Sequence, residues 1–523
     1  MVDKNRSSSI GMGLLSGTKI RIVISVVVAF VFHSSVYAGQ WYVTPALNFI
    51  ETFSDNINLA PSGSEKSAFV SQINPGISVQ HRGGRTNLNL NYQMQNIINQ
   101  GGGGGVNIHN QLFATGASEL VRNRLFLNAA SSISQQNIVN TGRVTTSNIN
   151  STANRTDVYT ASVNPVWTPY FGGYANGVVR LGYDFVNTST AATGTSNIYS
   201  VNAQLQSGYK FSNIGWRLGY NDSYSDRSLG GNVRFRSYNG EIRYYFTRKY
   251  AAILSFGNSS NNFQSNTNTN QNGSYYLAGF AWTPTQKFSL EGGYGQNLQY
   301  VQIRVAPSIR TNLSVRFQHS DVGTNTGDVW NAALSHQTGR TNWQARYFED
   351  TTTTQQLLLN QNPFNQAISN TVAGVSSNLS LPSLTNQVIV RKQGQLSVSG
   401  VTGRSTLNLA LFHSRREFQL SLTRDTSIGA AVSWRWRFTP RTNSVLGLSW
   451  NRNTTINSAG LVLNQRNNIY DVSFRLTRNI GDYFNIAKNI NGSVEYRFIK
   501  QDSSNPTFSY DENRIVALLN ILF

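Results

Sequence analysis

Segment Thr86–Asn96 reads TNLNLNYQMQN, and polar and apolar residues alternate from Asn87 to Gln95. Leu88, Leu90, Tyr92 and Met94 alternate with Asn and Gln side chains at the positions between them. Because successive side chains of a β-strand point to opposite faces, the segment predicts a strand with one apolar and one hydrated face.

The same alternation continues through most of the chain. It recurs over residues 313–318, 432–438, 470–477 and 494–498. The strands of a soluble β-sandwich also alternate, but they are typically about 5–6 residues long. The alternating segments here extend to about 10–13 residues, the length that a tilted strand needs to cross a bilayer.

Two kinds of connection separate these segments. Short turns such as Thr338-Gly339-Arg340 alternate with longer polar stretches such as Asn137–Arg155. Three of the short turns have an aromatic residue followed by Thr-Pro, at Trp167, Trp282 and Phe438. Short periplasmic turns and longer outer loops are typical of outer-membrane barrels, and aromatic rings prefer the membrane interface.

We therefore predict an all-β fold: one transmembrane antiparallel outer-membrane β-barrel over residues 39–523, in the outer membrane of a Gram-negative bacterium. At about 20–24 residues for each strand with its connection, this length gives about 20–24 strands, and about 22 is the best estimate. Segment Gln299–Ser308 is difficult to place either as a strand or as a loop.

Residues 1–38 predict a signal peptide that is cleaved on export. A basic start precedes the apolar run Ile22–Phe32, and Val36-Tyr37-Ala38 places small or short residues before Gly39. A membrane anchor is the alternative. However, a helix of this apolar run would rise only about 16 Å, which is half of a bilayer core.

The composition excludes several classes of protein. The chain has no cysteine, which excludes disulfide scaffolds, thiolate metal sites and thiol catalysis. Its 43 Lys+Arg against 23 Asp+Glu give a formal net charge of +20. Nucleic-acid binding is nevertheless not expected, because the basic residues are dispersed singly and the chain is predicted to be exported.

No arrangement of residues predicts catalysis, a metal or a cofactor. The six histidines form no His-x-x-x-His pair, and the sequence has no Gly-x-Ser-x-Gly motif. We therefore expect a protein that is not an enzyme. An outer-membrane hydrolase whose site is assembled from distant strands is the minor alternative.

The C-terminus resembles the recognition signal of outer-membrane barrel assembly. The chain ends at Phe523, and apolar side chains stand at every second position before it, at Ile521, Leu519, Ala517 and Ile515. This pattern predicts the barrel assembly machinery as a partner, together with outer-membrane lipid and lipopolysaccharide.

If the apolar face of each strand meets lipid, the alternate positions line the lumen. The lumenal acids are Asp184, Glu241, Asp471 and Glu495; the arginines are Arg180, Arg217, Arg243, Arg316, Arg346, Arg435, Arg437, Arg475 and Arg497. Rings of Arg or Lys favour anions in a pore, so these arginines predict a path for anions or an anionic polymer. In the alternative interpretation they only satisfy a polar lumen and pair with the acids.

Two further segments are unusual. Thr354–Asn386 is too long for an ordinary turn, so it either folds inward and narrows the pore or lies outside as a surface loop. The Gly101–Gly105 tract lacks the Lys-Ser/Thr and the strand-to-helix context of a phosphate-binding loop, and a flexible loop tip is expected there.

Several blocks of the mature chain resemble a known family. The chain opens with Trp41-Tyr42-Val43-Thr44-Pro45, and residues 51–61 read ETFSDNINLAP. Later blocks read SRREF over 414–418, FTPR over 438–441 and YDENR over 510–514. Together they resemble the PEP-CTERM system-associated outer-membrane β-barrel protein family.

This resemblance implies a partner process. The family is tied to exosortase sorting systems, which accompany exopolysaccharide synthesis in Gram-negative bacteria, and it has no established catalytic residues. A porin-like channel that exports polysaccharide or anionic solutes is therefore expected. The alternative is a non-conducting barrel that anchors surface polymer or sorted proteins. In the opening block, Asp55-Asn56-Ile57-Asn58 is compatible with a hard cation or with an Asx-rich turn.

Overall fold

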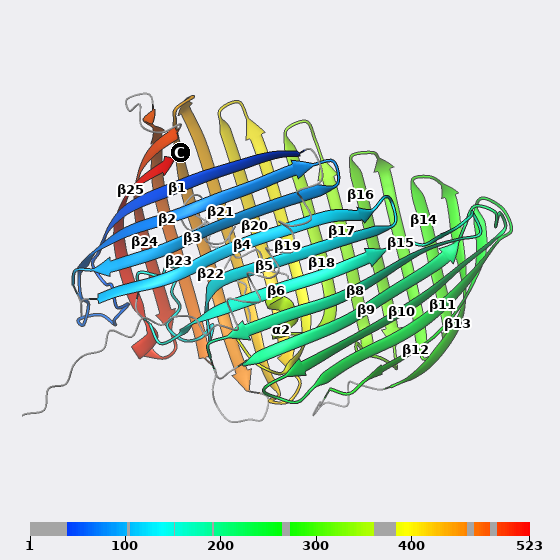
Figure 1. The fold of residues 1–523 in the computed structure, drawn as a ribbon. Coiled ribbons are helices and arrows are strands. Elements are labelled where there is room, and N and C mark those ends of the chain that lie inside the picture. Colours follow the sequence, from blue (N-terminus) through cyan, green and yellow to red (C-terminus); the bar gives the residue numbers. More distant parts are fainter. Residues whose placement is uncertain are drawn as a thin grey trace, which may run out of the picture.

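The computed structural model describes residues 39–101, 105–150, 152–190, 193–263, 272–359, 383–457, 465–481 and 489–523. Within these ranges the chain forms one antiparallel sheet that closes on itself (Figure 1). The predicted signal peptide, residues 1–38, lies outside the described residues.

The strands follow one another around the wall in chain order. In the first half they are β1 Gly39–Ser54, β2 Ala68–Gly83, β3 Thr86–Asn99, β4 Gly105–Val121, β5 Leu125–Asn137, β6 Arg155–Trp167, β7 Tyr170–Phe171, β8 Ala175–Thr188, β9 Thr195–Ser207, β10 Ile214–Arg227, β11 Val233–Tyr245 and β12 Tyr250–Asn261. In the second half they are β13 Gly273–Thr285, β14 Phe288–Gln296, β15 Leu298–Ser308, β16 Thr311–Ser320, β17 Gly327–Gln337, β18 Thr341–Thr353, β19 Val388–Thr402, β20 Ser405–Phe418, β21 Thr423–Thr439, β22 Thr442–Asn457, β23 Gln465–Asn479, β24 Asn489–Ser503 and β25 Tyr510–Leu522.

Twenty-four of these strands build the wall, because β7 is only a two-residue pairing with the start of β8. The predicted all-β antiparallel barrel is confirmed, and the strand number lies at the upper end of the predicted range, above the best estimate. The ambiguous segment Gln299–Ser308 belongs to β15. Asn297 alone joins β14 to β15, in a left-handed backbone conformation (φ 61°), so no Gly-Pro signal marks this turn.

The barrel is closed by its first and last strands. β25 pairs antiparallel with β1, from Ala46 opposite Leu522 to Ser54 opposite Arg514. The backbone N–H of Phe523 continues this ladder by donating to the carbonyl of Pro45, at 3.0 Å. Closure leaves no free sheet edge along these pairs, as a strand in lipid requires.

The two ends of the barrel differ. Short turns gather at the end that holds Gly39 and Phe523, and the longer connections gather at the other end. We call these the periplasmic end and the outer end, following the usual arrangement of outer-membrane barrels. Trp167, Trp282 and Phe438, which precede the Thr-Pro turns, lie exposed at the periplasmic end.

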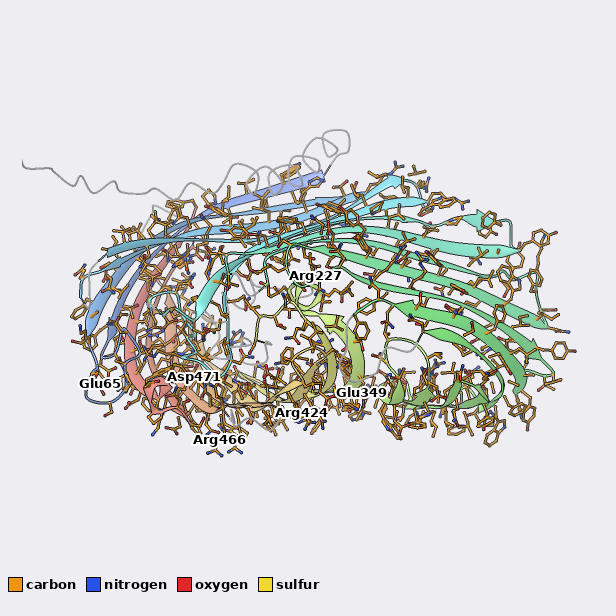
Figure 2. All side chains as sticks on the ribbon, turned by 90° about the horizontal axis from the view of Figure 1, so that it is seen from below. Glu65, Arg227, Glu349, Arg424, Arg466 and Asp471 are labelled. Atoms are coloured by element: carbon orange, nitrogen blue, oxygen red, sulfur yellow. The ribbon has the colours of Figure 1, made fainter. Side chains whose placement is uncertain are left out.

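The wall separates an apolar outer face from a polar inner face. On β24, Val494 and Tyr496 are 59% and 47% exposed and point outward, whereas Glu495 and Arg497 between them are 6% and 4% exposed and point inward. Seen from below, the wall surrounds an elongated interior, with Asp471 directed to the interior and Arg466 away from it (Figure 2).

Helical structure is scarce in the part of the chain described. It includes α2 Thr354–Leu359, which follows β18, and the 3₁₀ turn η4 Pro506–Phe508 between β24 and β25. None of the described helices is long and apolar enough to cross a membrane.

Candidate transport lumen

The connection between β5 and β6 folds into the outer half of the lumen. We call its described residues, 138–150 and 152–154, the inner loop. Two of its apolar side chains, Val144 and Ile149, are buried against lumen-facing or outer-loop residues of the surrounding wall. Val144 packs with Leu59, Ile469, Ile499 and Tyr510, and Ile149 with Ile57, Ala68, Val70 and Ile97.

Polar contacts hold the inner loop on β25. The hydroxyl of Tyr510 donates to the carbonyl of Val144 at 2.6 Å. The Asn150 amide donates to Glu512 Oε1 at 3.1 Å, and Asn150 Oδ1 accepts from Arg514 Nη2 at 2.9 Å. Because these partners are buried, each contact also prevents a desolvated polar group from being left unpaired.

Beneath the inner loop, three arginines of β23–β25 pair with three carboxylates. All six side chains are at most 11% exposed. The pairs are Arg475 Nε to Glu495 Oε2 at 2.6 Å, Arg497 Nε to Asp471 Oδ1 at 3.0 Å, and Arg514 Nη2 to Glu512 Oε2 at 2.6 Å. The charge of these three arginines is therefore largely compensated.

A second segment crosses the lumen from the opposite wall. Helix α2 leaves the outer end of β18, and its Leu358 packs with Val158 of β6 and Val186 of β8. Leu384, which also belongs to the long Thr354–Asn386 connection, joins the same cluster. Residues 354–359 and 383–386 thus lie inside the barrel, while residues 360–382 are outside the described ranges.

Five other predicted lumenal arginines carry positive charge that no described carboxylate compensates by an ion pair. All five are exposed, and each lies within five residues of the periplasmic end of its strand. They are Arg180 of β8, Arg217 of β10, Arg346 of β18, and Arg435 and Arg437 of β21. Among the described residues, none of them has a carboxylate within 4 Å; Arg180 contacts Asn202, and Arg346 lies over Phe348. We call these five residues the basic belt.

The other two predicted arginines, Arg243 of β11 and Arg316 of β16, also lie within five residues of the periplasmic ends of their strands. Arg243 is paired with Glu241 at 3.2 Å and with Glu291 at 3.0 Å. Arg316 stacks over the ring of Tyr300, with 4.5 Å between the guanidinium carbon and the ring centroid. The two interpretations of the lumenal arginines therefore apply to different residues: pairing describes Arg243, Arg475 and Arg497, and an anion path along the basic belt stays a prediction.

The three residues of the predicted assembly signal lie on the outer face of β25. Leu519 and Ile521 are partly exposed, and Phe523 is 45% exposed at the periplasmic end. Recognition by the assembly machinery stays a prediction.

The Asx-rich block near the start of the chain has a structural explanation. Asn56 is fully buried, and its amide accepts from the N–H of Ala60 and donates to the carbonyl of Ala60, both at 2.8 Å. Asn56 thus stabilises its own loop, as an Asx-rich turn does. Among the described residues, no group of three or more His, Cys, Asp or Glu side chains is placed to hold a metal ion.

Sequence reasoning missed the inner loop, because it treated Asn137–Arg155 as one of the polar outer connections. The available signal is weak: Val144 and Ile149 are isolated apolar residues in a segment of Asn, Ser and Thr. Reasoning by strand alternation also left out Arg155 and Arg514, which become important only because the inner loop brings them together.

Strand length, closure and the apolar outer face decide the location of the protein. Strands of 9–17 residues in the wall, excluding β7, are long enough to cross a bilayer, and the closed ladder leaves no unpaired edge in lipid. The chain is an outer-membrane β-barrel. A barrel of this size with a polar lumen is compatible with a channel or transporter.

Comparison with known proteins finds solved structures that match most of this chain at low sequence identity. The FrpB iron transporter from Neisseria meningitidis (F3-3 variant) is 11% identical, with a TM-score of 0.44 over 95% of this chain and 83% of that one. The siderophore receptor PirA from Acinetobacter baumannii is 9% identical, with a TM-score of 0.42 over 92% and 80%. OprD from Pseudomonas aeruginosa is 7% identical, with a TM-score of 0.30 over 94% and 97%. No family model matches the chain, and no curated protein matches its sequence.

Proposed function

We propose that this barrel is a gated, porin-like transport protein of an exosortase-linked exopolysaccharide system, and that it passes anionic polysaccharide or smaller anionic solutes. The resemblance of the sequence to the PEP-CTERM-associated barrel family supports the choice of system. The basic belt supports the choice of an anionic cargo.

The single observation that carries this proposal is the contrast between two sets of lumenal arginines. Buried arginines of β23 and β24 are paired with carboxylates, whereas the five arginines of the basic belt are exposed without a carboxylate partner among the described residues. Exposed cations on a low-dielectric wall raise the local concentration of anions and lower the barrier to their entry. Export from the periplasm would meet this belt first.

The inner loop and α2 give the gate in this proposal. Both lie beyond the basic belt on the way to the outer end, and both are anchored by apolar contacts to the wall. A transport barrel of this design would conduct in bursts or only after one of these segments moves. The same segments favour the second candidate, a permanently closed barrel that anchors surface polymer or sorted protein.

Planar-bilayer conductance of the refolded mature chain tests the proposal, with ion selectivity read from a salt gradient. We expect an anion-preferring channel whose selectivity falls when Arg346, Arg435 and Arg437 are replaced with Gln. Arg466→Gln is the matched control, because Arg466 points away from the lumen at the outer end (Figure 2).

Each other outcome has a definite meaning. Cation preference in the wild type would refute the anionic cargo. A silent bilayer, with correct folding shown by a heat-modifiable gel shift, would favour the anchoring role. Hydrolysis of a polysaccharide by the purified barrel would instead support the minor alternative of an enzyme.

A further inference from the structure

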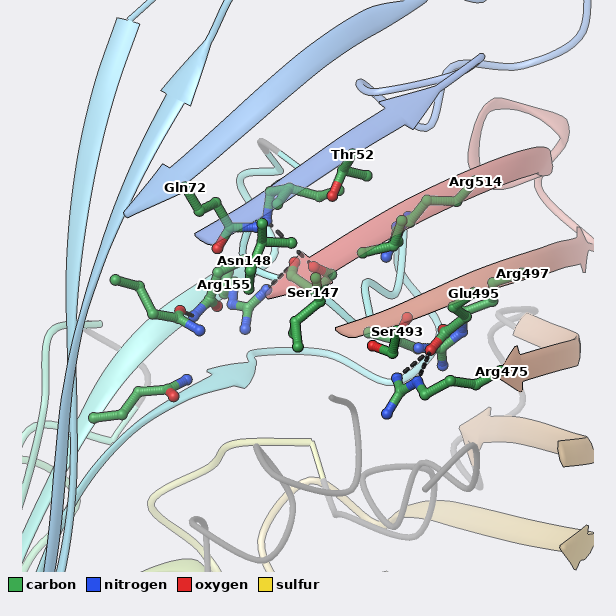
Figure 3. A pocket seen from close by; sticks show the side chains of 17 residues that line it. Thr52, Gln72, Ser147, Asn148, Arg155, Arg475, Ser493, Glu495, Arg497 and Arg514 are labelled. Atoms are coloured by element: carbon green, nitrogen blue, oxygen red, sulfur yellow. Dashed lines mark hydrogen bonds and ion pairs between the residues drawn. The ribbon is translucent and has the colours of Figure 1, made fainter. Parts of the chain in front are cut away.

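A small cavity lies between the inner loop and the barrel wall (Figure 3). Its volume is about 100 Å³, and it is lined by the inner loop together with β1–β4, β6 and β23–β25. The space corresponds to a few water molecules, which suits a carboxylate or phosphate group and is too small for a whole sugar ring.

Four arginines line this cavity: Arg155, Arg475, Arg497 and Arg514. The last three are paired with Glu495, Asp471 and Glu512, as described above. Arg155 has no such partner in the described part of the chain: its guanidinium donates to the carbonyl of Ser147, and no described carboxylate lies within 4 Å of it. The nearby Asp157 accepts instead from Gln135 Nε2, at 2.9 Å.

Two of these arginines also leave donors unused. The Nε atoms of Arg155 and Arg514 are both buried without a hydrogen-bond partner among the residues that the structure describes, and the Arg514 residue is only 4% exposed. A buried guanidinium donor without an acceptor costs free energy, and a buried cation without a counter-charge costs more. Hydroxyl and amide groups of Ser147, Asn148 and Ser493 surround the same space.

We propose that this cavity binds one small oxoanion, a carboxylate or a phosphate, with Arg155 as its main counter-charge. The anion would accept from the free donors of Arg155 and Arg514, which come from β6 and β25. Charge-assisted hydrogen bonds of guanidinium to such groups are among the strongest in proteins.

A bound anion would contact both the inner loop and the barrel wall and would stabilise the inward position of the inner loop. Ser147 and Asn148 belong to the inner loop, whereas Arg475, Ser493 and Arg514 belong to β23, β24 and β25. A ligand that contacts both sides binds only when the inner loop is folded inward, so it stabilises that arrangement by its whole binding free energy. This inference goes beyond the proposed transport role and does not depend on it.

Binding is tested on the refolded, full-length mature barrel in detergent, without any measurement of conductance. The thermal midpoint is measured at constant ionic strength while chloride is exchanged for inorganic phosphate, sulfate or acetate. We expect at least one of these probes to raise the midpoint, and the response to identify whether phosphate-type or carboxylate anions fit. Arg155→Gln should weaken the apparent affinity by about tenfold or more, the loss expected for one charge-assisted hydrogen bond.

Two further variants keep the test decisive if Arg155→Gln does not fold. Ser493→Leu fills the cavity from the wall without removing a charge and should abolish the response, whereas Arg466→Gln, on the side of β23 that faces away from the lumen, should leave it intact. No response of the wild type to any probe would overturn the proposal. An equal response in wild type and Ser493→Leu would overturn it as well.

Discussion

Replacing Asp471 with Asn should destabilise the folded barrel by several kcal/mol. The side chains of Asp471 and Arg497 are 1% and 4% exposed, and Arg497 Nε lies 3.0 Å from Asp471 Oδ1. Removing one partner of a buried ion pair leaves an uncompensated charge, which costs about 3–5 kcal/mol. We expect a loss of about 3 kcal/mol, because Asn keeps one acceptor oxygen and Glu495 lies two residues away on the same face of β24.

Strand β24, which carries Arg497, also provides a matched control. Lys500 and Asp502 form an ion pair at 3.5 Å with side chains that are 48% and 50% exposed. Asp502→Asn should therefore cost only about 0–1 kcal/mol. The double variant Asp471→Leu/Arg497→Met removes both buried charges, so it should recover most of the stability that Asp471→Asn loses.

Urea unfolding of the mature chain refolded in lipid vesicles measures these differences, with tryptophan fluorescence as the signal. The expected gap in unfolding free energy between Asp471→Asn and Asp502→Asn is about 2 kcal/mol or more. If the two single variants are equally stable, the buried ion pair between Asp471 and Arg497 does not stabilise the folded barrel to the extent expected.

Three further outcomes are expected. Val144→Asp buries a carboxylate between Leu59 and Ile469, so it should release the inner loop and make the Arg143 peptide bond several-fold more sensitive to trypsin in the folded barrel, as seen by limited proteolysis. Gly208→Ala should lower the free energy of unfolding in urea by about 1–3 kcal/mol, because a Cβ at Gly208 would lie 2.1 Å from the carbonyl oxygen of Gly173. Phe523→Ser should reduce the amount of assembled barrel in outer membranes, measured by the heat-modifiable gel shift, while the same chain still refolds in detergent.

Features that depend on local patterning could be predicted from the sequence. The outward direction of Val494 and Tyr496, and the inward direction of Glu495 and Arg497, follow from the period of two that every strand shares. Closure into a barrel follows as well, since long alternating strands with one apolar face have no other stable arrangement in lipid. The strand number was less certain, because Asn297 alone makes the β14–β15 turn without a Gly-Pro signal.

Only the tertiary structure decides which lumenal arginines form ion pairs and which are exposed without one. Arg475, Arg497, Arg435 and Arg437 have the same alternation in sequence, yet the first two are buried in ion pairs and the last two are exposed. The difference arises because register brings acids from a neighbouring strand within reach of the first two, whereas no described acid comes that close to the last two.

The course of the inner loop could not be predicted from the sequence pattern either. Residues 138–154 look like other polar connections, and their inward course depends on the fit of Val144 and Ile149 into apolar sites made by β2, β3 and β23–β25. The cavity between Arg155 and Arg514 also exists only through that fit, across some 360 positions of sequence. Period-two alternation specifies the face of each residue from its neighbours in the chain, but contacts inside a lumen are made between strands, and their energies depend on distance and burial after closure.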